Sequence, residues 1–174
     1  WTPFSDILRI QLLAEYGGVW ADASTDCAQP LSNWLPQLMS AGFFAYSAPG
    51  RDRLISSWFM ASHKGSPIIE EMDASIKRYW AFHRNGAHTY FWLHYLFNMK
   101  QLTSRRFRRQ LYFMPRVSAS SPHYVQFALR EQKIIDPGIV SGIPVHKLTY
   151  KWEIEADDIK DALDSNLEYE SSGI

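Results

Sequence analysis

The feature that most constrains the fold is an amphipathic segment that ends at two glycines and leads at once into a short apolar run. Thr2-Pro3 predicts a helix start, because proline is favoured in the first turn, where its missing N–H costs nothing. The helix should run to about Tyr16 and stop at Gly17-Gly18, since a helix end favours a residue that tolerates positive φ. Residues 19–21 are then predicted as a short buried strand that carries Asp22 at its C-terminal end.

Strands and helices continue to alternate along the chain. Residues 43–48, "FFAYSA", predict a strand, whereas residues 54–65 fit either a strand or a helix. Ser66-Pro67 is a good helix start, and that helix should run to about Phe82. We also expect a short helix within 29–39, helices over 90–99 and 121–132, a turn at Asp136-Pro137-Gly138, an extended segment over 144–152 and an acidic helix over about 156–168. Interleaved elements of this kind indicate an α/β fold in a single domain over residues 1–174.

Composition narrows the classes of function. The 18 basic and 18 acidic residues balance, so the net charge favours neither a nucleic-acid binder nor a protein for acidic substrates. No apolar run is long enough to span a bilayer. The one cysteine, Cys27, excludes an internal disulfide framework and fits a reducing compartment. We therefore expect a cytoplasmic globular domain that binds no nucleic acid.

Two charged residues interrupt the apolar side of the first predicted helix. At about 100° per residue, Gln11 and Glu15 mark the side that should face water. The residues of the apolar side are Leu8, Ile10, Leu12, Leu13 and Tyr16. Asp6 and Arg9 fall in the middle of that apolar arc, three positions apart, so their side chains can meet. Because burying charge is expensive, such a pair either satisfies itself and the nearby backbone or faces a polar ligand in a cleft.

Asp22 is a third charged residue in an unexpected place. A carboxylate at the C-terminal end of a strand can hold a divalent cation, which in turn neutralises phosphates. Ser24, Thr25 and Asp26 follow in "DASTDC" and add hard oxygen ligands, which suit Mg²⁺ or Mn²⁺ better than zinc. The other interpretation is a turn, because Asp, Ser and Thr side chains bond their own backbone where strands end.

The combination of S-D-x-x-R, an apolar helix, G-G and W-x-D resembles glycosyltransferases that carry a DXD motif. Among them, the chain is similar to the bacterial capsular polysaccharide synthesis family, which is like glycosyltransferase family 32. That family is related to glycan-extending mannosyltransferase-like enzymes and, more distantly, to the large clostridial glucosylating toxins. The resemblance is specific over residues 4–31 and continues weakly through "ISSWFMASHKGSPII", "YFWLHYLF" and "VHKLTYK".

The resemblance implies a GT-A fold, a mixed sheet flanked by helices with a nucleotide-sugar donor at its C-terminal edge. In such enzymes the Asp and Arg of S-D-x-x-R contact the donor sugar, which assigns that role to Asp6 and Arg9. The resemblance also implies that Gly18 belongs to the donor-sugar site. It implies that Asp22 lies beside the ribose, the sugar and the metal-bound diphosphate. The family's nucleotide-binding strands precede this motif, and only residues 1–4 do so here, so we expect those strands to be absent from this chain.

The chain departs from the DXD pattern at the second carboxylate, which is Ser24. A divalent cation, Mn²⁺ or Mg²⁺, is nevertheless expected, with Asp22, Ser24, Asp26 and His146 as its candidate ligands. Asp26 could replace the missing carboxylate, although a position two residues further on can point the other way. His146, in "PVHKLTYK", is either a late ligand of the metal and diphosphate or a surface strand residue.

The resemblance predicts a glycosyltransferase that moves a sugar from a nucleotide sugar to a glycan or lipid-linked acceptor, in capsular or cell-surface polysaccharide synthesis. Asp22 and Arg9 are the expected catalytic residues, and a retaining, hexosyltransferase-like reaction is implied by the relatives. The alternative is a non-catalytic sugar-binding or assembly module that keeps a degenerate GT-A fold. Ser24 and the missing amino-terminal strands both motivate that alternative.

A basic run and several histidines complete the candidates. "SRRFRRQ", residues 104–110, is interpreted either as a solvated basic loop or as a contact to an anionic membrane surface or lipid-phosphate acceptor. The second interpretation predicts peripheral contact with the inner face of the membrane. His63, His83, His88 and His94 lack metal-ligand spacing on one helix face and are expected to be structural.

Overall fold

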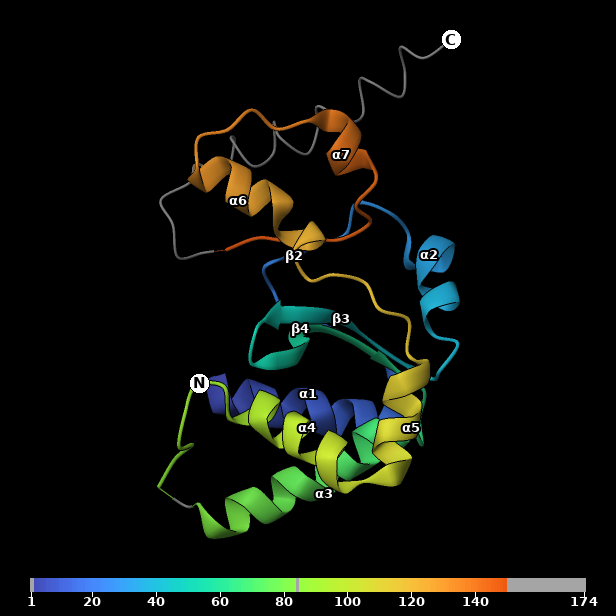
Figure 1. Cartoon of the computed structure of the whole chain (residues 1–174), viewed down its shortest axis with the longest axis vertical. Helices are drawn as coiled ribbons and strands as arrows, with labels where there is room; N and C mark the ends of the chain where they lie inside the picture. The colour runs from blue at the N-terminus through green and yellow to red at the C-terminus, as the bar shows by residue number, and fades with distance from the viewer. Residues whose placement is uncertain (1, 84, 150–174) are drawn as a thin grey trace. The chain divides into compact units, whose positions relative to one another are not determined.

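The structure is a computed structural model, and it describes residues 2–83 and 85–149 (Figure 1). The described residues fall into two compact units. The first contains residues 2–21 and 35–119, and the second contains residues 22–34 and 120–149. The single domain predicted over residues 1–174 stays a prediction. The acidic helix predicted over about 156–168 lies outside the described residues.

The first helix and its glycine stop confirm the sequence prediction. Helix α1 spans Thr2–Tyr16 and strand β1 spans Gly18–Ala21. Gly17 and Gly18 have φ of +71° and +90°, the backbone region that favours glycine. The strand itself was expected to be buried, and that expectation is wrong. It is an edge strand with Trp20 half-buried and its other residues exposed, because it pairs on one side only, with strand β4.

The sheet of the first unit has the order β1-β4-β3, and its strands pair antiparallel. Strand β3 spans Phe43–Gly50, as predicted, and strand β4 spans Arg53–Ser62, which resolves the ambiguous segment 54–65 as a strand. A parallel bridge joins Ser47 to Ser118 beyond the named strands. Helices α1, α3, α4 and α5 lie on one side of this sheet (Figure 1). The α/β class, with helices flanking a sheet, is therefore confirmed.

The core of the first unit lies between this sheet and the helices. Helix α3 spans Pro67–Phe82, as predicted, and helix α4 spans Trp92–Thr103, two residues later than expected at its start. Apolar side chains of both helices meet side chains of α1 and the strands. Buried members of this core include Ile10, Leu13, Phe43, Met60, Ile68, Met72, Ile76, Phe97 and Phe107. Burial of this apolar area is the main force that holds the helices on the sheet.

The basic run forms a helix, so the prediction of a solvated loop is wrong. Helix α5 spans Arg105–Phe113, and the Ser104 hydroxyl caps it by accepting a hydrogen bond from the Phe107 N–H at 3.2 Å. Ser66 was expected to cap α3 in the same way. Instead, the Gln110 side chain takes that role: its Oε1 accepts from the Ile68 N–H at 2.8 Å and from the Ser66 hydroxyl at 3.0 Å.

The second unit is small and mostly irregular. Strand β2, Thr25–Asp26, pairs antiparallel with strand β5, His146–Lys147. The predicted helix over 121–132 is a short 3₁₀ turn, Ser121–His123, followed by helix α6, Tyr124–Arg130. Helix α2, Leu31–Leu38, is present as expected, with residues 31–34 in the second unit and residues 35–38 in the first.

Asp136 begins a helix rather than a simple turn. Its carboxylate accepts a hydrogen bond from the Gly138 N–H at 2.8 Å and so caps helix α7, Pro137–Ser141. The same three residues favour both outcomes, because Asp caps helices and Pro suits their first turn. Val140 of this helix packs on Val125 of α6 in a small core.

None of the described helices is both long and apolar enough to cross a membrane.

Candidate functional site

Asp6 and Arg9 form a buried ion pair on α1. Asp6 and Arg9 are each 4% exposed, and Nη2 of Arg9 lies 3.4 Å from Oδ1 of Asp6. The guanidinium also donates to the Ser57 carbonyl of β4 at 2.5 Å and to the Ser5 carbonyl at 3.2 Å. Its carbon lies 5.2 Å from the ring centre of Trp20 on β1. Arg9 thus joins the helix to two strands of the sheet.

This network compensates much of the cost of burying the pair. Loss of hydration costs several kcal/mol per ion, and hydrogen bonds to carbonyls together with a neighbouring ring repay part of it. Every nitrogen of the Arg9 guanidinium has a partner in the structure: Nε and Nη1 reach backbone carbonyls, and Nη2 reaches Asp6 and the Ser5 hydroxyl. The arrangement holds the guanidinium plane in one orientation.

The helical pattern of α1 is only partly as predicted. Gln11 and Glu15 are exposed, and Ile10 and Leu13 are buried, as the wheel indicated. Leu12 and Tyr16 were placed on the apolar side and are instead exposed, at 39% and 68%. The buried stripe, which includes Asp6 and Arg9, is therefore narrower than the wheel suggested.

The two glycines after α1 have different surroundings. A Cβ on Gly17 would lie 2.7 Å from the Lys64 backbone nitrogen and 3.0 Å from the Ser62 carbonyl oxygen. A Cβ on Gly18, the glycine predicted to belong to the donor-sugar site, would meet nothing within 4 Å. Gly17 is therefore required by both its φ and a close backbone approach, whereas Gly18 is required by φ alone and leaves open space beside it.

In the second unit, Asp22 and Ser24 share one cation, the ammonium group of Lys147. Nζ of Lys147 donates a hydrogen bond to the Ser24 hydroxyl and lies 3.9 Å from Oδ2 of Asp22. The side chains of Lys147 and Asp22 are 16% and 31% exposed, so the group lies at the surface of the unit. The pairing of β2 with β5 brings these residues together across more than a hundred positions of sequence. The sequence predicts His146 as a member of this site, whereas nothing in the sequence pattern points to the neighbouring Lys147.

Asp26 and His146 lie opposite each other on the same two strands. Thr25 and Lys147 form the next pair, and successive residues of a strand point to opposite faces, so Asp26 faces away from Lys147. His146 is fully buried, and neither ring nitrogen has a hydrogen-bond partner among the described residues. Burial lowers the pKa of the His146 imidazole, and the charge of Asp26 opposes that shift.

The four predicted metal ligands are therefore divided between two faces of this strand pair. Within residues 2–83 and 85–149, no three His, Cys, Asp or Glu side chains come close enough to hold a metal ion. Cys27, beside this group, is exposed and is not part of a disulfide. The arrangement places the positive charge of Lys147 against Asp22 and Ser24, with the Asp22 side chain 31% exposed.

His94 is a further polar group of the first unit that the sequence did not single out as functional. Its Nδ1 has no hydrogen-bond partner in the part of the chain that the structure describes, and its ring meets Phe91 edge to face at 5.7 Å. Burial lowers the pKa of His94 to about 4, with Arg53 and Arg9 acting in the same direction and Asp52 against them. This neutral imidazole fits the structural role predicted for it.

His83 also agrees with a structural role. Its ring stacks on Tyr79 at 4.0 Å, and its Nδ1 lies 2.8 Å from the Tyr79 carbonyl oxygen. His88 meets His83 edge to face at 4.6 Å. These contacts place the rings of Tyr79, His83 and His88 in one cluster at the end of α3.

Comparison with known proteins decides the family. The family model described as capsular polysaccharide synthesis protein matches residues 1–165. The chain belongs to the capsular polysaccharide synthesis protein family. Membership assigns it a role in capsular polysaccharide synthesis, which requires a sugar donor and an acceptor as substrates. Searches of curated proteins and of solved structures found no match.

Proposed function

We propose that this protein is a glycosyltransferase, which transfers a sugar from a nucleotide-sugar donor to a glycan or lipid-linked acceptor of the capsule. One observation carries the proposal: within a capsular polysaccharide synthesis family chain, S-D-x-x-R buries an Asp–Arg pair on α1, and the next strand leads directly into Asp22. Carboxylates bind sugar hydroxyls, and a cationic group stabilises a diphosphate, so these residue types suit the chemistry.

Each residue has a role in this proposal. Asp6 accepts hydrogen bonds from hydroxyls of the donor sugar, and Arg9 orients the sugar and stabilises charge on the leaving diphosphate. Asp22 lies beside the ribose and the sugar, and Gly18 leaves room for the donor because a Cβ there would meet nothing. The rigid hold on Arg9 by the Ser57 carbonyl favours this role, since a fixed dipole or charge needs no reorganisation during the reaction.

The reaction breaks the bond between C1 of the donor sugar and the diphosphate oxygen, and the nucleoside diphosphate leaves with the electron pair. An acceptor hydroxyl oxygen forms the new bond to C1. In the retaining course proposed here, the acceptor approaches from the side of the leaving group, and its proton passes to the departing phosphate oxygen. The protein contributes by orienting the sugar and by stabilising the charge that grows on the diphosphate.

The divalent cation predicted from the resemblance does not fit the candidate ligands as they are arranged. Lys147 already holds the Ser24 hydroxyl and faces Asp22, while Asp26 and His146 lie on the other face of the strands. A positive ion between Asp22 and Ser24 would have to displace the ammonium group. The proposed reaction therefore has no step through a metal.

Turnover of donor by the full chain tests the proposal. Hydrolysis or transfer is measured with a panel of uridine and guanosine diphosphate sugars, with and without Mn²⁺, for the wild type, Asp6→Ala and Asp22→Ala. We expect turnover by the wild type and a large loss in both variants. Asp73→Ala on α3 is the matched control, because among the described residues the Asp73 carboxylate forms its ion pair with Lys77 of the same helix and with no residue of the proposed site. Unchanged turnover in both site variants would overturn the assignment of the site.

A sugar-binding or assembly module without chemistry is the second candidate, and Ser24 in place of the second DXD carboxylate favours it. Calorimetric titration with nucleotide sugars and with capsular oligosaccharides separates the two. Binding of a nucleotide sugar supports the transferase. Binding of the oligosaccharide without any donor binding supports the module.

A further inference from the structure

The solvent side of α5 combines arginines with aromatic rings. Phe107 and Leu111 are buried in the core, so the opposite side of this helix faces outward. That outward side carries four arginines and two aromatic residues, Arg105, Arg106, Arg108, Arg109, Tyr112 and Phe113. Tyr112 and Phe113 are 77% and 61% exposed, which is a high exposure for two neighbouring large aromatic side chains.

The positive charge of this face is only partly neutralised by the protein. Arg106 pairs with Glu70 of α3 at 2.9 Å, and Nη1 of Arg108 donates to the carbonyls of Gln101 and Leu102 at 3.1 Å. For Arg105 and Arg109 the structure gives no ion pair or hydrogen bond with any described residue. Within the described ranges, Arg105 and Arg109 are thus available for an anion, and no carboxylate pairs with Arg108.

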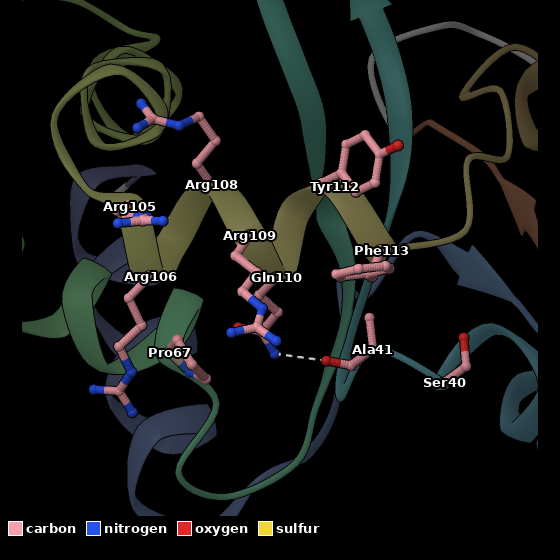
Figure 2. A pocket seen from close by; sticks show the side chains of 10 residues that line it. All are labelled: Ser40, Ala41, Pro67, Arg105, Arg106, Arg108, Arg109, Gln110, Tyr112 and Phe113. Atoms are coloured by element: carbon pink, nitrogen blue, oxygen red, sulfur yellow. Dashed lines mark hydrogen bonds between the residues drawn. The ribbon is translucent and has the colours of Figure 1, made fainter.

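The face borders an open hollow of about 1120 Å³, whose wall α5 forms together with Ser40, Ala41 and Pro67 (Figure 2). Figure 2 shows the arginine side chains spread along the helix and the two rings near its C-terminal end. The arginines therefore do not converge on one enclosed point, as they would around a single phosphate. A broad, shallow surface with charge along it suits an extended anionic partner.

The helix that carries this face is firmly held. Nε2 of Gln110 donates to the Ala41 carbonyl at 2.8 Å, while its Oε1 accepts from Ser66 and Ile68 on the α3 side. At the N-terminal end of α5, the Ser104 hydroxyl donates a hydrogen bond to Oε1 of Glu71 on α3 at 2.7 Å. The arginines are thus presented on a rigid helix, so binding costs little ordering of the backbone.

We propose that the outward face of α5 is a docking surface for an anionic phospholipid bilayer. Arginines bind lipid phosphates through paired N–H donors, and exposed Tyr and Phe rings favour the boundary between headgroups and acyl chains. Leu102, 76% exposed just before α5, adds apolar surface next to the arginines. The balanced charge of the whole chain, 18 basic and 18 acidic residues, means that this attraction is local and not a general property of the protein.

Vesicle sedimentation tests the docking surface. The full chain is mixed with vesicles of phosphatidylcholine with 30% phosphatidylserine, or of phosphatidylcholine alone, at about 0.1 M salt. We expect binding to the anionic vesicles only, and its loss in 0.5 M salt because surface charges are then screened. The double variant Arg105→Gln/Arg109→Gln should lower the affinity roughly 25-fold, at about fivefold for each basic residue.

A matched variant removes two other arginines of the same unit. Arg51→Gln/Arg78→Gln makes the same change of charge away from α5, and we expect binding within about twofold of the wild type. Tyr112→Ser/Phe113→Ser should weaken binding and leave its salt dependence in place, since the rings act through apolar contact. Circular dichroism melting of every variant confirms that the fold is kept.

Three results would overturn the docking surface. The first is no binding of the wild type to anionic vesicles. The second is an equal loss of binding in both arginine double variants, which would point to non-specific charge. The third is tight binding of a soluble phosphate compound, such as glycerophosphoserine, or of a DNA oligonucleotide that prevents vesicle binding, because the face would then be a general anion site.

A second inference rests on the proposed function and on a different observation, the contact of Lys147 with Ser24. We infer that the Lys147 ammonium group takes the place of the metal in this DXD-like site. In a DXD motif, the second carboxylate would bind the metal cation. Here that position is Ser24, whose hydroxyl accepts a hydrogen bond from Lys147. The first carboxylate, Asp22, lies 3.9 Å from the same nitrogen. Because a serine hydroxyl is neutral, this site has one negative charge fewer than a DXD motif. The single positive charge of an ammonium group can therefore balance the charge of Asp22.

In the reaction, Lys147 stabilises the negative charge that grows on the leaving diphosphate when the C1–O bond breaks. The lysine keeps its proton throughout, so no further reactant is needed. Its side chain is partly exposed, at 16%, and a phosphate oxygen can reach it from the solvent side.

Turnover and nucleotide binding in the presence of EDTA test this inference. We expect wild-type turnover to be unaffected by EDTA, Lys147→Met to lose about 100-fold, and Lys147→Arg to keep a tenth or more. Lys64→Met, a surface lysine of the first unit, is the matched control and should retain full turnover. Turnover that EDTA abolishes and Mn²⁺ restores would overturn the role of Lys147 and leave the transferase intact.

A separate readout keeps the two proposals distinct. If no condition gives turnover, calorimetric titration with uridine and guanosine diphosphate in EDTA is decisive for Lys147. Binding that Lys147→Met loses and Lys147→Arg retains supports the lysine as the diphosphate contact, although the transferase proposal fails. Binding that does not depend on Lys147, or that appears only with Mn²⁺, overturns the inference.

Discussion

Two charged groups of this protein differ in how the fold uses them. The Asp6–Arg9 pair of the first unit is buried, with side chains only 6% and 5% exposed, and Arg9 also bonds backbone of both α1 and β4. The side chains of Asp22 and Lys147 in the second unit are 31% and 16% exposed, and Lys147 also donates a hydrogen bond to the Ser24 hydroxyl. The first group is therefore built into the structure, and the second remains accessible.

The difference in burial predicts how much each charged pair contributes to the stability of the fold. Removal of one partner from a buried, hydrogen-bonded pair leaves an uncompensated charge in the interior, which is strongly destabilising. Removal of one partner from a pair near the surface changes stability little, because water takes over the solvation. Function can therefore be separated from stability at Asp22 much more easily than at Arg9.

The largest expected effect is on stability at Arg9. Arg9→Met should lower the free energy of unfolding by about 3–5 kcal/mol, since Asp6 then lies buried without its cation. Urea unfolding followed by circular dichroism measures the change. Asp6→Asn/Arg9→Met is the matched control and should recover part of the loss. A loss below about 1 kcal/mol for the single variant would break the comparison, because the pair would then behave like a surface pair.

The next effect is on turnover at Asp22. Asp22→Asn should lower donor turnover about 100-fold, equal to roughly 2.7 kcal/mol of transition-state stabilisation. The free energy of unfolding should change by less than about 1 kcal/mol. Steady-state kinetics and urea unfolding of the same preparation check both numbers. A large loss of stability would mean that this pair, like the first, serves the fold.

Gly17 and Gly18 lie in the sequence between the Asp6–Arg9 pair and Asp22. Substitution of each glycine tests how much the backbone between the two charged groups contributes to stability. Gly17→Ala should cost about 2 kcal/mol, because it combines a φ of +71° with a Cβ only 2.7 Å from the Lys64 backbone nitrogen. Gly18→Ala should cost about 1 kcal/mol, since only the φ of +90° opposes it. Urea unfolding of the two variants compares them directly, and equal losses would contradict the close approach at Gly17.

The smallest effect is the acid sensitivity that His94 adds to the first unit. Its pKa is lowered to about 4 in the folded state, so the unfolded chain takes up a proton first as pH falls below about 6.5. Stability is thus full above pH 6.5 and declines towards pH 4, by about 1 kcal/mol at pH 5.5. His94→Gln should flatten this part of the curve of unfolding free energy against pH. An unchanged slope in His94→Gln would show that other titrating groups, and not His94, cause the decline.

Much of the fold follows from local sequence. The helix over residues 2–16, its double-glycine stop, the strand near 43–48 and the helix begun by Ser66-Pro67 all appear where the pattern predicts them. Periodicity, proline and glycine act within a few residues, so one chain segment contains all the information they need. The position of Asp6 and Arg9 on the buried side of α1 was predictable for the same reason.

Other features depend on which segments meet. The edge position of β1 exposes residues that an apolar run would place inside, and Gln110 caps α3 from 42 residues away. The basic run became a helix with one buried side because Phe107 and Leu111 find a place in the core.

By itself, the sequence determined the family, the first helix with its internal ion pair, and the glycine stop that leads to Asp22. Only the tertiary structure decided what stands beside Asp22 and Ser24. The pairing of β2 with β5 brings Lys147 to the position where the motif leads one to expect a metal, and it turns Asp26 and His146 to the other face. Strand register is a property of two distant segments together, and one residue of register changes the face that every side chain meets.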